Sequence, residues 1–159
     1  MRCHSVVVVA AADRIEAAEE AVVFVVGSRG EEQRIDRLIE LTVAELEAVV
    51  CGAIGTSELM EFVRFDSGDV LRKERGGQGP KMLRLVVGNP LIMKEMAKAV
   101  PDAASYAPVT ILIDERADGV HLSYDSMASL IAPYGSEAAL VVARGLDAKV
   151  ETLLEAAAR

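Results

Sequence analysis

The sequence contains no tryptophan, and aromatic residues make up only 4% of its 159 residues. Its hydrophobic core must therefore be built from Val, Leu, Ile, Ala and Met, with methionine filling gaps that rings would otherwise occupy. Hydrophobic residues nevertheless reach 52%, which excludes an intrinsically disordered chain. A chain of this length can bury roughly two-thirds of its unfolded surface in one core. We therefore expect a single domain over residues 1–159.

Positive charge is also scarce, because 17 Lys and Arg stand against 25 Asp and Glu, for a net charge of -8. Nucleic-acid binding without sequence preference needs clustered Lys and Arg, so no nucleic-acid partner is expected. No apolar run approaches the ~18 residues of a membrane-spanning helix, since the longest, Ala21–Val26, stops at Gly27. We expect a cytoplasmic protein that does not bind membranes.

Only two cysteines are present, and they lie far apart as Cys3 and Cys51. Without a second pair they indicate neither a disulfide framework nor a zinc site. The one glycine-rich stretch, Glu74–Lys81, lacks the Gly-Lys-Ser/Thr ending of a phosphate loop, so we interpret it as a mobile connector. We expect neither a cofactor nor a metal.

The first third of the chain predicts one strand followed by helices. Ser5–Ala11 is a run rich in β-branched residues, as in a buried strand. Asp13–Val26 has helical spacing and acidic residues in its first half, although its last five residues alone also suit a strand. Glu31–Leu41 is amphipathic, and a further helix to Cys51 is expected to start at Thr42, where Thr and Glu stand at capping-box spacing.

The middle of the chain predicts strands and one helix. Leu59–Asp66 and Asp69–Glu74 flank the turn dipeptide Ser67-Gly68 and predict a β-hairpin. Met82–Val87 predicts the next strand. A helix is expected from Pro90 to Val100, because proline suits the first helical position and a second proline ends the run.

The turn between that strand and that helix is the predicted ligand site. Backbone N–H groups at Gly88 and Asn89 meet the start of a helix, where the helix dipole favours an anion. Lys94 would add positive charge, and Tyr106 would add an apolar wall. A small anionic metabolite with a carboxylate or phosphate is the predicted ligand. A helix cap formed by Asn89 also explains the turn without any ligand.

Val109–Ser126 predicts a hairpin with Asp118-Gly119 as its two-residue loop, which sets Arg116 opposite His121. Polar side chains then share one face of the sheet, and that face is expected to be open to solvent, a partner subunit or a ligand. Apolar side chains share the helix-covered face, with Glu115 as the exception: Ile111, Ile113, Val120, Leu122 and Tyr124.

His121 is the basis of an alternative, enzymatic function. On the polar face it lies near Asp114 and Asp125, and a histidine beside a carboxylate can act as a general base in a hydrolase-like enzyme. An ordinary polar pair with Arg116 explains it equally well. The sequence has no second base, oxyanion donor pair or cofactor motif, so we expect no catalytic residues and favour a protein that binds a small ligand or a partner.

The last segments predict a short helix over Met127–Ala132 and a long amphipathic helix that Ser136 caps and that packs on the sheet. Together the elements predict a two-layer α+β fold, with helices on one face of an antiparallel sheet. Because the other face and an edge strand stay uncovered, we expect a homodimer.

Three segments also carry a family resemblance: Leu83–Pro90, Tyr106–Ile113 and Asp118–Val120. Their strand with a Gly-Asn-Pro turn, Pro-led strand and Asp-Gly hairpin resemble the domain-of-unknown-function 302 family over about Leu59 to Leu154. The resemblance implies a β-α-β(4)-α sheet of the TATA-binding-protein-like type. It implies no activity, because the family has none established.

Overall fold

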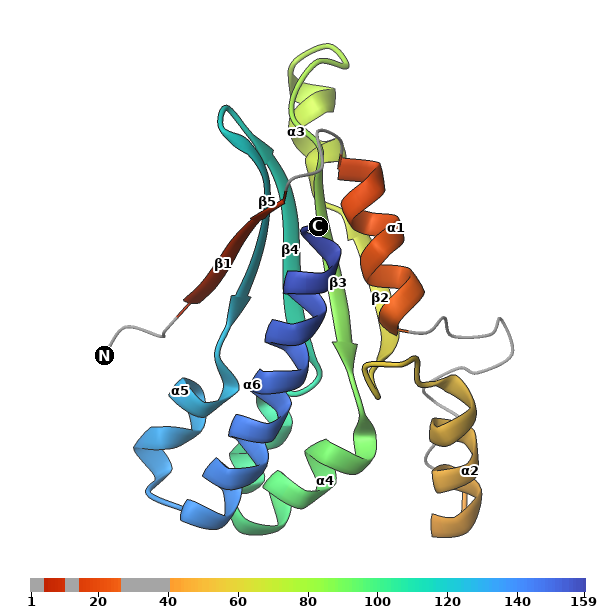
Figure 1. Ribbon diagram of the computed structural model, residues 1–159, viewed down its shortest axis with the longest axis vertical. Coiled ribbons are helices and arrows are strands. Elements are labelled where there is room, and N and C mark those ends of the chain that lie inside the picture. Colours follow the sequence, from red (N-terminus) through yellow and green to blue (C-terminus); the bar gives the residue numbers. More distant parts are fainter. Residues whose placement is uncertain (1–4, 11–14, 27–40) are drawn as a thin grey trace.

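The computed structural model describes residues 5–10, 15–26 and 41–159 (Figure 1). Five strands form one antiparallel sheet in the order β1-β5-β4-β3-β2, which leaves β1 and β2 at its edges. The elements in chain order are β1 (Ser5–Ala10), α1 (Ile15–Val26), α2 (Val43–Ala53), β2 (Met60–Asp66), α3 (Gly68–Glu74), β3 (Met82–Gly88), α4 (Pro90–Ala99), the 3₁₀ helix η2 (Pro101–Ser105), β4 (Val109–Arg116), β5 (Gly119–Asp125), α5 (Met127–Ile131), the 3₁₀ helix η3 (Ala132–Tyr134) and α6 (Glu137–Ala157).

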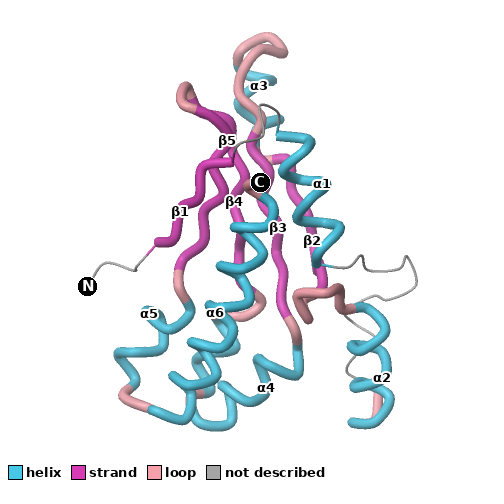
Figure 2. Tube along the Cα trace, viewed as in Figure 1, coloured by secondary structure: helices cyan, strands magenta, loops and turns pink. Residues whose placement is uncertain are grey.

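Helices α1, α4, α5 and α6 contribute to one hydrophobic core with the apolar face of the sheet. Figure 2 shows α6 and α1 running side by side in front of the strands, whereas α2 lies beyond the end of β2. Core side chains of the sheet are fully buried there, Ile111, Ile113 and Leu122 among them. The predicted two-layer α+β fold is therefore confirmed. None of the helices in the described part of the chain is long and apolar enough to cross a lipid bilayer.

The β4–β5 hairpin confirms the predicted faces and corrects the predicted turn. Arg116 pairs with Gly119, so Ala117 and Asp118 form the two-residue loop and the predicted loop is wrong by one residue. Every pairing is consequently shifted by two positions. A shift of two keeps each side chain on its predicted face, because side chains alternate along a strand with a period of two. Gly119, with φ of 136°, begins β5 in a conformation that a β-carbon disfavours.

The predicted hairpin between Leu59–Asp66 and Asp69–Glu74 is wrong in its second segment. That segment belongs to helix α3, and β2 pairs instead with β3. The Asp66 carboxylate accepts hydrogen bonds from the Asp69 N–H at 2.9 Å and from Arg72 at 2.6 Å. These bonds satisfy a free N–H of the first helical turn and tie the helix to the end of the strand. A seven-residue segment is too short for its apolar spacing to separate helix from strand.

The N-terminal elements form as predicted where the structure describes them, but β1 is an edge strand with Val7 and Val9 exposed, so the prediction that it is a buried strand is wrong. β1 and α1 form, and β1 pairs with β5 along one edge of the sheet. Helix α2 begins with the predicted capping box: the Glu45 N–H donates to Thr42 Oγ1 at 3.3 Å, and the Thr42 N–H donates to the Glu45 carboxylate at 2.8 Å. The predicted helix over Glu31–Leu41 falls almost wholly on residues 27–40, which lie outside the described residues.

Candidate functional site

The face of the sheet opposite the helices is the part of the molecule where a site can form. Cross-strand partners share a face, and one row of partners crosses all five strands: Val7, Ser123, Leu112, Arg84 and Phe65. Several large apolar side chains on this face are exposed, with fractions of 49% for Val7, 50% for Val9, 38% for Val63 and 47% for Phe65. We call this surface the open sheet face. Its mixture of apolar and polar side chains suits contact with a ligand or a protein.

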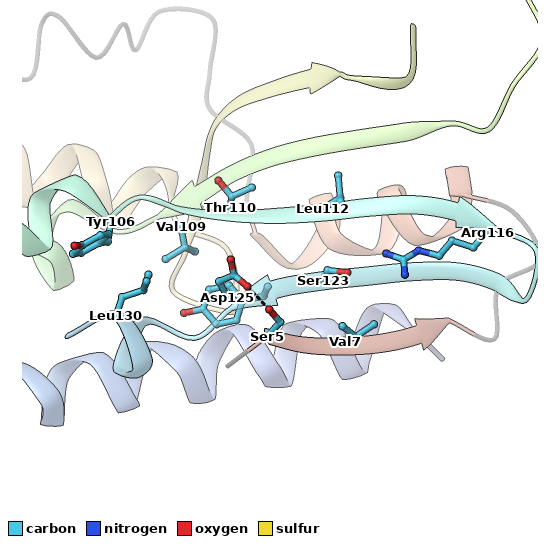
Figure 3. A pocket seen from close by; sticks show the side chains of 11 residues that line it. Ser5, Val7, Tyr106, Val109, Thr110, Leu112, Arg116, Ser123, Asp125 and Leu130 are labelled. Carbon is cyan, nitrogen blue, oxygen red and sulfur yellow. Dashed lines mark hydrogen bonds between the residues drawn. The ribbon is translucent and has the colours of Figure 1, made fainter. Parts of the chain in front are cut away.

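A pocket of about 530 Å³ lies on the open sheet face along β1, β4 and β5. Small-ligand sites commonly enclose roughly 300 to 1,000 Å³. Figure 3 shows Arg116 toward one end of the strands, Tyr106 and Leu130 toward the other, and Asp125 beside Ser5. The pocket is therefore elongated, with different chemistry at its two ends. Between the ends, its floor includes Val7, Thr110, Leu112 and Ser123.

The two charged groups of the pocket differ in how well they are neutralised. Arg116 donates from Nε and Nη2 to the Asp114 carboxylate at 2.6 and 3.2 Å, and this pairing raises the pKa of Arg116. Asp114 is buried, so the arginine charge is largely balanced within the protein. Asp125 accepts a hydrogen bond from Ser5, which is a neutral hydroxyl. It pairs with no cationic side chain among the described residues.

Ser123 contributes an unsatisfied polar atom to the pocket. Its Oγ is buried and has no hydrogen-bond partner in the part of the chain that the structure describes. Buried polar side-chain atoms nearly always have a partner, whether protein or ordered water. The Ser123 hydroxyl is therefore an unsatisfied polar group beneath the pocket surface, and a molecule in the pocket would bond to it only after neighbouring side chains move aside.

Tyr106 closes one end of the pocket with its ring. Its hydroxyl lies 2.9 Å from the hydroxyl of Tyr134, and the two rings meet edge to face at a centroid distance of 6.4 Å. This hydrogen bond raises the pKa of Tyr134 to about 12. Since the Tyr106 hydroxyl already has a partner, the residue offers mainly its apolar ring to a ligand. Tyr106 is the one predicted ligand residue that lines this pocket.

The other predicted ligand residues lie at the turn that leads from β3 into α4. Asn89 caps α4 as predicted, with its Oδ1 accepting from the Leu91 N–H at 2.9 Å, while its Nδ2 donates to the Glu58 carbonyl at 3.0 Å. Both ends of its amide are thus used within the protein. Gly88 is packed so closely that an added β-carbon would lie 3.0 Å from Pro108.

Lys94 lies one helical turn further along α4. Its Nζ is 3.9 Å from Glu47 and 3.8 Å from Glu95, so its positive charge already faces two carboxylates. Anion binding through Gly88, Asn89 and Lys94 stays a prediction. Of the two locations, the pocket on the open sheet face offers an unsatisfied polar atom and the turn does not.

His121 was the predicted base of the enzymatic alternative. It faces Asp114 across the hairpin rather than Arg116, and its Nε2 lies 2.9 Å from Oδ1 of Asp118. This hydrogen bond lowers the pKa of Asp118. The ring is buried, and its Nδ1 has no partner among the described residues. Neither predicted carboxylate, Asp114 or Asp125, hydrogen-bonds to His121, so the enzymatic alternative gains no support.

Asp147 in α6 is a buried carboxylate that sequence reasoning missed. It accepts four hydrogen bonds: from the hydroxyls of Tyr124 (2.6 Å) and Ser126 (2.7 Å) and from the backbone N–H groups of Met127 (2.7 Å) and Ala128 (3.0 Å). Burial, together with the bond to Asp147, raises the pKa of Tyr124. The cluster joins the middle of α6 to the end of β5 and the start of α5.

This cluster also bears on the pocket, because Tyr124, whose hydroxyl donates to Asp147, is one of the lining residues. Asp147 is therefore a positioning residue for the pocket rather than part of its lining. A signal was present in the sequence: Asp147 stands between Ala143 and Val150 on the core-facing side of an amphipathic helix. A charged residue at a core position implies buried hydrogen-bond partners.

Metal binding has no visible basis in residues 5–10, 15–26 and 41–159, where no group of three or more His, Cys, Asp or Glu side chains is placed to hold an ion. Cys51, which lies in α2, is a free and exposed thiol.

Comparison with known proteins bears on the family rather than on the site. The family model described as Domain of unknown function DUF302 matches residues 35–157. A solved structure of an uncharacterised conserved DUF302 protein from Bacillus stearothermophilus matches with a TM-score of 0.66 at 12% sequence identity, over 98% of this chain and 98% of that one. At such low identity the likeness shows the fold alone. No curated protein matches the chain.

Proposed function

This chain belongs to the DUF302 family, and we propose that it binds a small molecule in the pocket on the open sheet face. The observation that carries the proposal is the buried Ser123 hydroxyl, which lines a pocket of ligand size and has no partner among the described residues. Two charged groups of opposite sign, Arg116 at one end and Asp125 nearer the other, together with apolar side chains along the strands, would fix the orientation of a ligand, as in known small-molecule sites.

The ligand proposal predicts that filling the pocket abolishes binding. A fragment library containing neutral, cationic and anionic molecules is screened by thermal shift, and hits are repeated on two variants. Ser123→Leu replaces the unsatisfied hydroxyl by a larger apolar side chain, so hits should be lost. Lys94→Ala, at the turn that the sequence predicts as an anion site, should leave them unchanged.

The two variants separate the two locations. Hits that survive in Ser123→Leu and disappear in Lys94→Ala would place the ligand at the Gly88-Asn89 turn. A screen with no saturable hit on the wild-type protein would reject ligand binding at either location.

We also propose that the chain forms a homodimer in the cytoplasm through the β2 side of the open sheet face, which lies outside the pocket lining. The support is the exposure of Val63 and Phe65 on that side of the face. Exposed apolar patches on soluble proteins commonly mark interaction surfaces. Arg84 stacks over the Phe65 ring at 5.7 Å from its centroid, which gives this part of the face a preformed aromatic and cationic surface.

The dimer proposal predicts a mass of about twice the 17.0 kDa of one chain by light scattering at micromolar concentration. Phe65→Glu should shift the protein toward the monomer, because it buries a charge in the proposed interface. Val70→Glu is the matched control, since Val70 is 71% exposed on α3 and away from the sheet face. A wild-type monomer across a hundredfold dilution, or equal dissociation by both variants, would contradict the proposed interface.

A further inference from the structure

The charge balance within the pocket indicates what kind of ligand fits it. Two charged side chains line the pocket, and their charges are opposite: Arg116 and Asp125. Arg116 is held in a two-point pair with the buried Asp114, at 2.6 and 3.2 Å. The charge of the guanidinium is thus already balanced by a buried carboxylate, and an incoming anion would find only the N–H groups that Asp114 leaves free, without an unpaired positive charge.

Asp125 is in the opposite situation. Its hydrogen bond comes from the neutral hydroxyl of Ser5, so its negative charge is not balanced by any cation within the described residues. A cationic ligand group could therefore pair with Asp125 without breaking an existing ion pair. The net charge of the chain, -8, also raises the local concentration of cations at its surface.

The surroundings of Asp125 suit the remainder of such a molecule. Tyr106 and Leu130 lie toward the same end of the pocket, and Leu112 and Val7 lie along the strands from it (Figure 3). The Tyr106 hydroxyl is already bonded to Tyr134, which leaves its ring as the surface it offers. Aromatic rings attract cations through their negative faces.

Resting on the proposed ligand-binding function, we propose that the ligand is a small organic cation. Its ammonium group binds at the Asp125 carboxylate near the Tyr106 ring, and its apolar body lies over Leu112 and Val7. The Ser123 hydroxyl accepts a hydrogen bond from a polar group on that body or donates one to it. This reverses the ligand charge that the sequence predicts for the Gly88-Asn89 turn.

The test compares three probes of nearly equal size: benzylammonium, benzyl alcohol and benzoate. Binding is followed in the intact protein through the methyl NMR signals of Val7 and Leu112, which report on the pocket itself. Benzylammonium should shift these signals saturably and bind more tightly than the other two. Binding should weaken as salt is raised, because partly exposed ion pairs are screened.

Variants assign the effect to the carboxylate. Asp125→Asn should weaken benzylammonium binding about fivefold, the scale of a partly exposed ion pair. Asp69→Asn removes the same charge on α3, outside the pocket lining, and should change binding little. Arg116→Gln should not weaken benzylammonium binding.

Any of three results would overturn the inference. The first is that benzoate binds at least as tightly as benzylammonium and that Arg116→Gln abolishes benzoate binding. This would show an anion site, and the proposed ligand-binding function would still stand. Equal benzylammonium binding by Asp125→Asn and wild type, or no shift of the pocket methyl signals by benzylammonium, would reject the cation. The proposed function itself fails only if the broader fragment screen is also empty.

Discussion

Replacement of Asp147 by alanine is expected to lower the free energy of unfolding by roughly 3 to 5 kcal/mol. The substitution removes the acceptor for four hydrogen bonds and leaves the buried Tyr124 and Ser126 hydroxyls and the Ala128 N–H without their acceptor, whereas the Met127 N–H keeps the Tyr124 hydroxyl at 3.1 Å. A buried donor left without a partner costs about 1 to 3 kcal/mol, and bonds to a charged acceptor are at the stronger end. The total stays below the sum of three such terms because water and side-chain movement satisfy part of the cluster.

Chemical denaturation with urea measures the effect. Glu155→Ala is the matched control, because Glu155 is exposed on the same helix, and it should change stability by no more than about 0.5 kcal/mol. Asp147→Asn keeps one acceptor oxygen, so its free energy of unfolding should lie between those of Asp147→Ala and Glu155→Ala. Equal stability of Asp147→Ala and wild type would mean that the cluster contributes nothing net, since apolar replacement of buried charged networks is sometimes neutral.

The second large effect compares one leucine on each face of the central hairpin. Leu122→Ala should lower the free energy of unfolding by about 2 to 5 kcal/mol, because Leu122 is fully buried under the helices and its loss leaves a cavity. Leu112→Ala should cost less, because Leu112 lies on the open sheet face and is only partly buried. Both losses are read from urea denaturation at fixed protein concentration, since dimerisation would couple stability to concentration.

The comparison also tests which face is covered. Similar large losses from both substitutions would mean that Leu112 is buried in solution, as in a dimer formed through the open sheet face. Dilution separates that case from an error in the fold: a loss at Leu112 that shrinks on dilution belongs to an interface.

Local patterns in the sequence determined much of the fold. The alternation along Val109–Ser126 assigned every side chain of the hairpin to its correct face, because a strand buried on one side must separate apolar from polar residues. The caps at Thr42 and Asn89 were predicted correctly for a similar reason: helix termini need side-chain acceptors within three residues, so the signal is local. These predictions depend on neighbours along the chain.

Features that depend on how elements pair and pack were decided by the tertiary structure. The hairpin register escaped prediction because a slip of two positions preserves the face pattern and is settled by turn geometry. The segment Asp69–Glu74 is helical and not a strand because the partner of β2 is β3, which follows the whole of α3 in the chain. Asp147 acquires its partners from β5 and α5, about twenty residues earlier in the chain.

The pocket is also a feature that only the tertiary structure decided. Its lining combines side chains of β1, β4 and β5 with Tyr106 and Leu130. Its two charged side chains differ in their partners, because Arg116 is paired with the charged Asp114 and Asp125 with the neutral hydroxyl of Ser5. The sequence could supply the residue types, and it correctly placed a polar face on the sheet. Charge balance is set by which groups come within hydrogen-bonding distance, and that is fixed when β1 pairs with β5 across more than one hundred residues of chain.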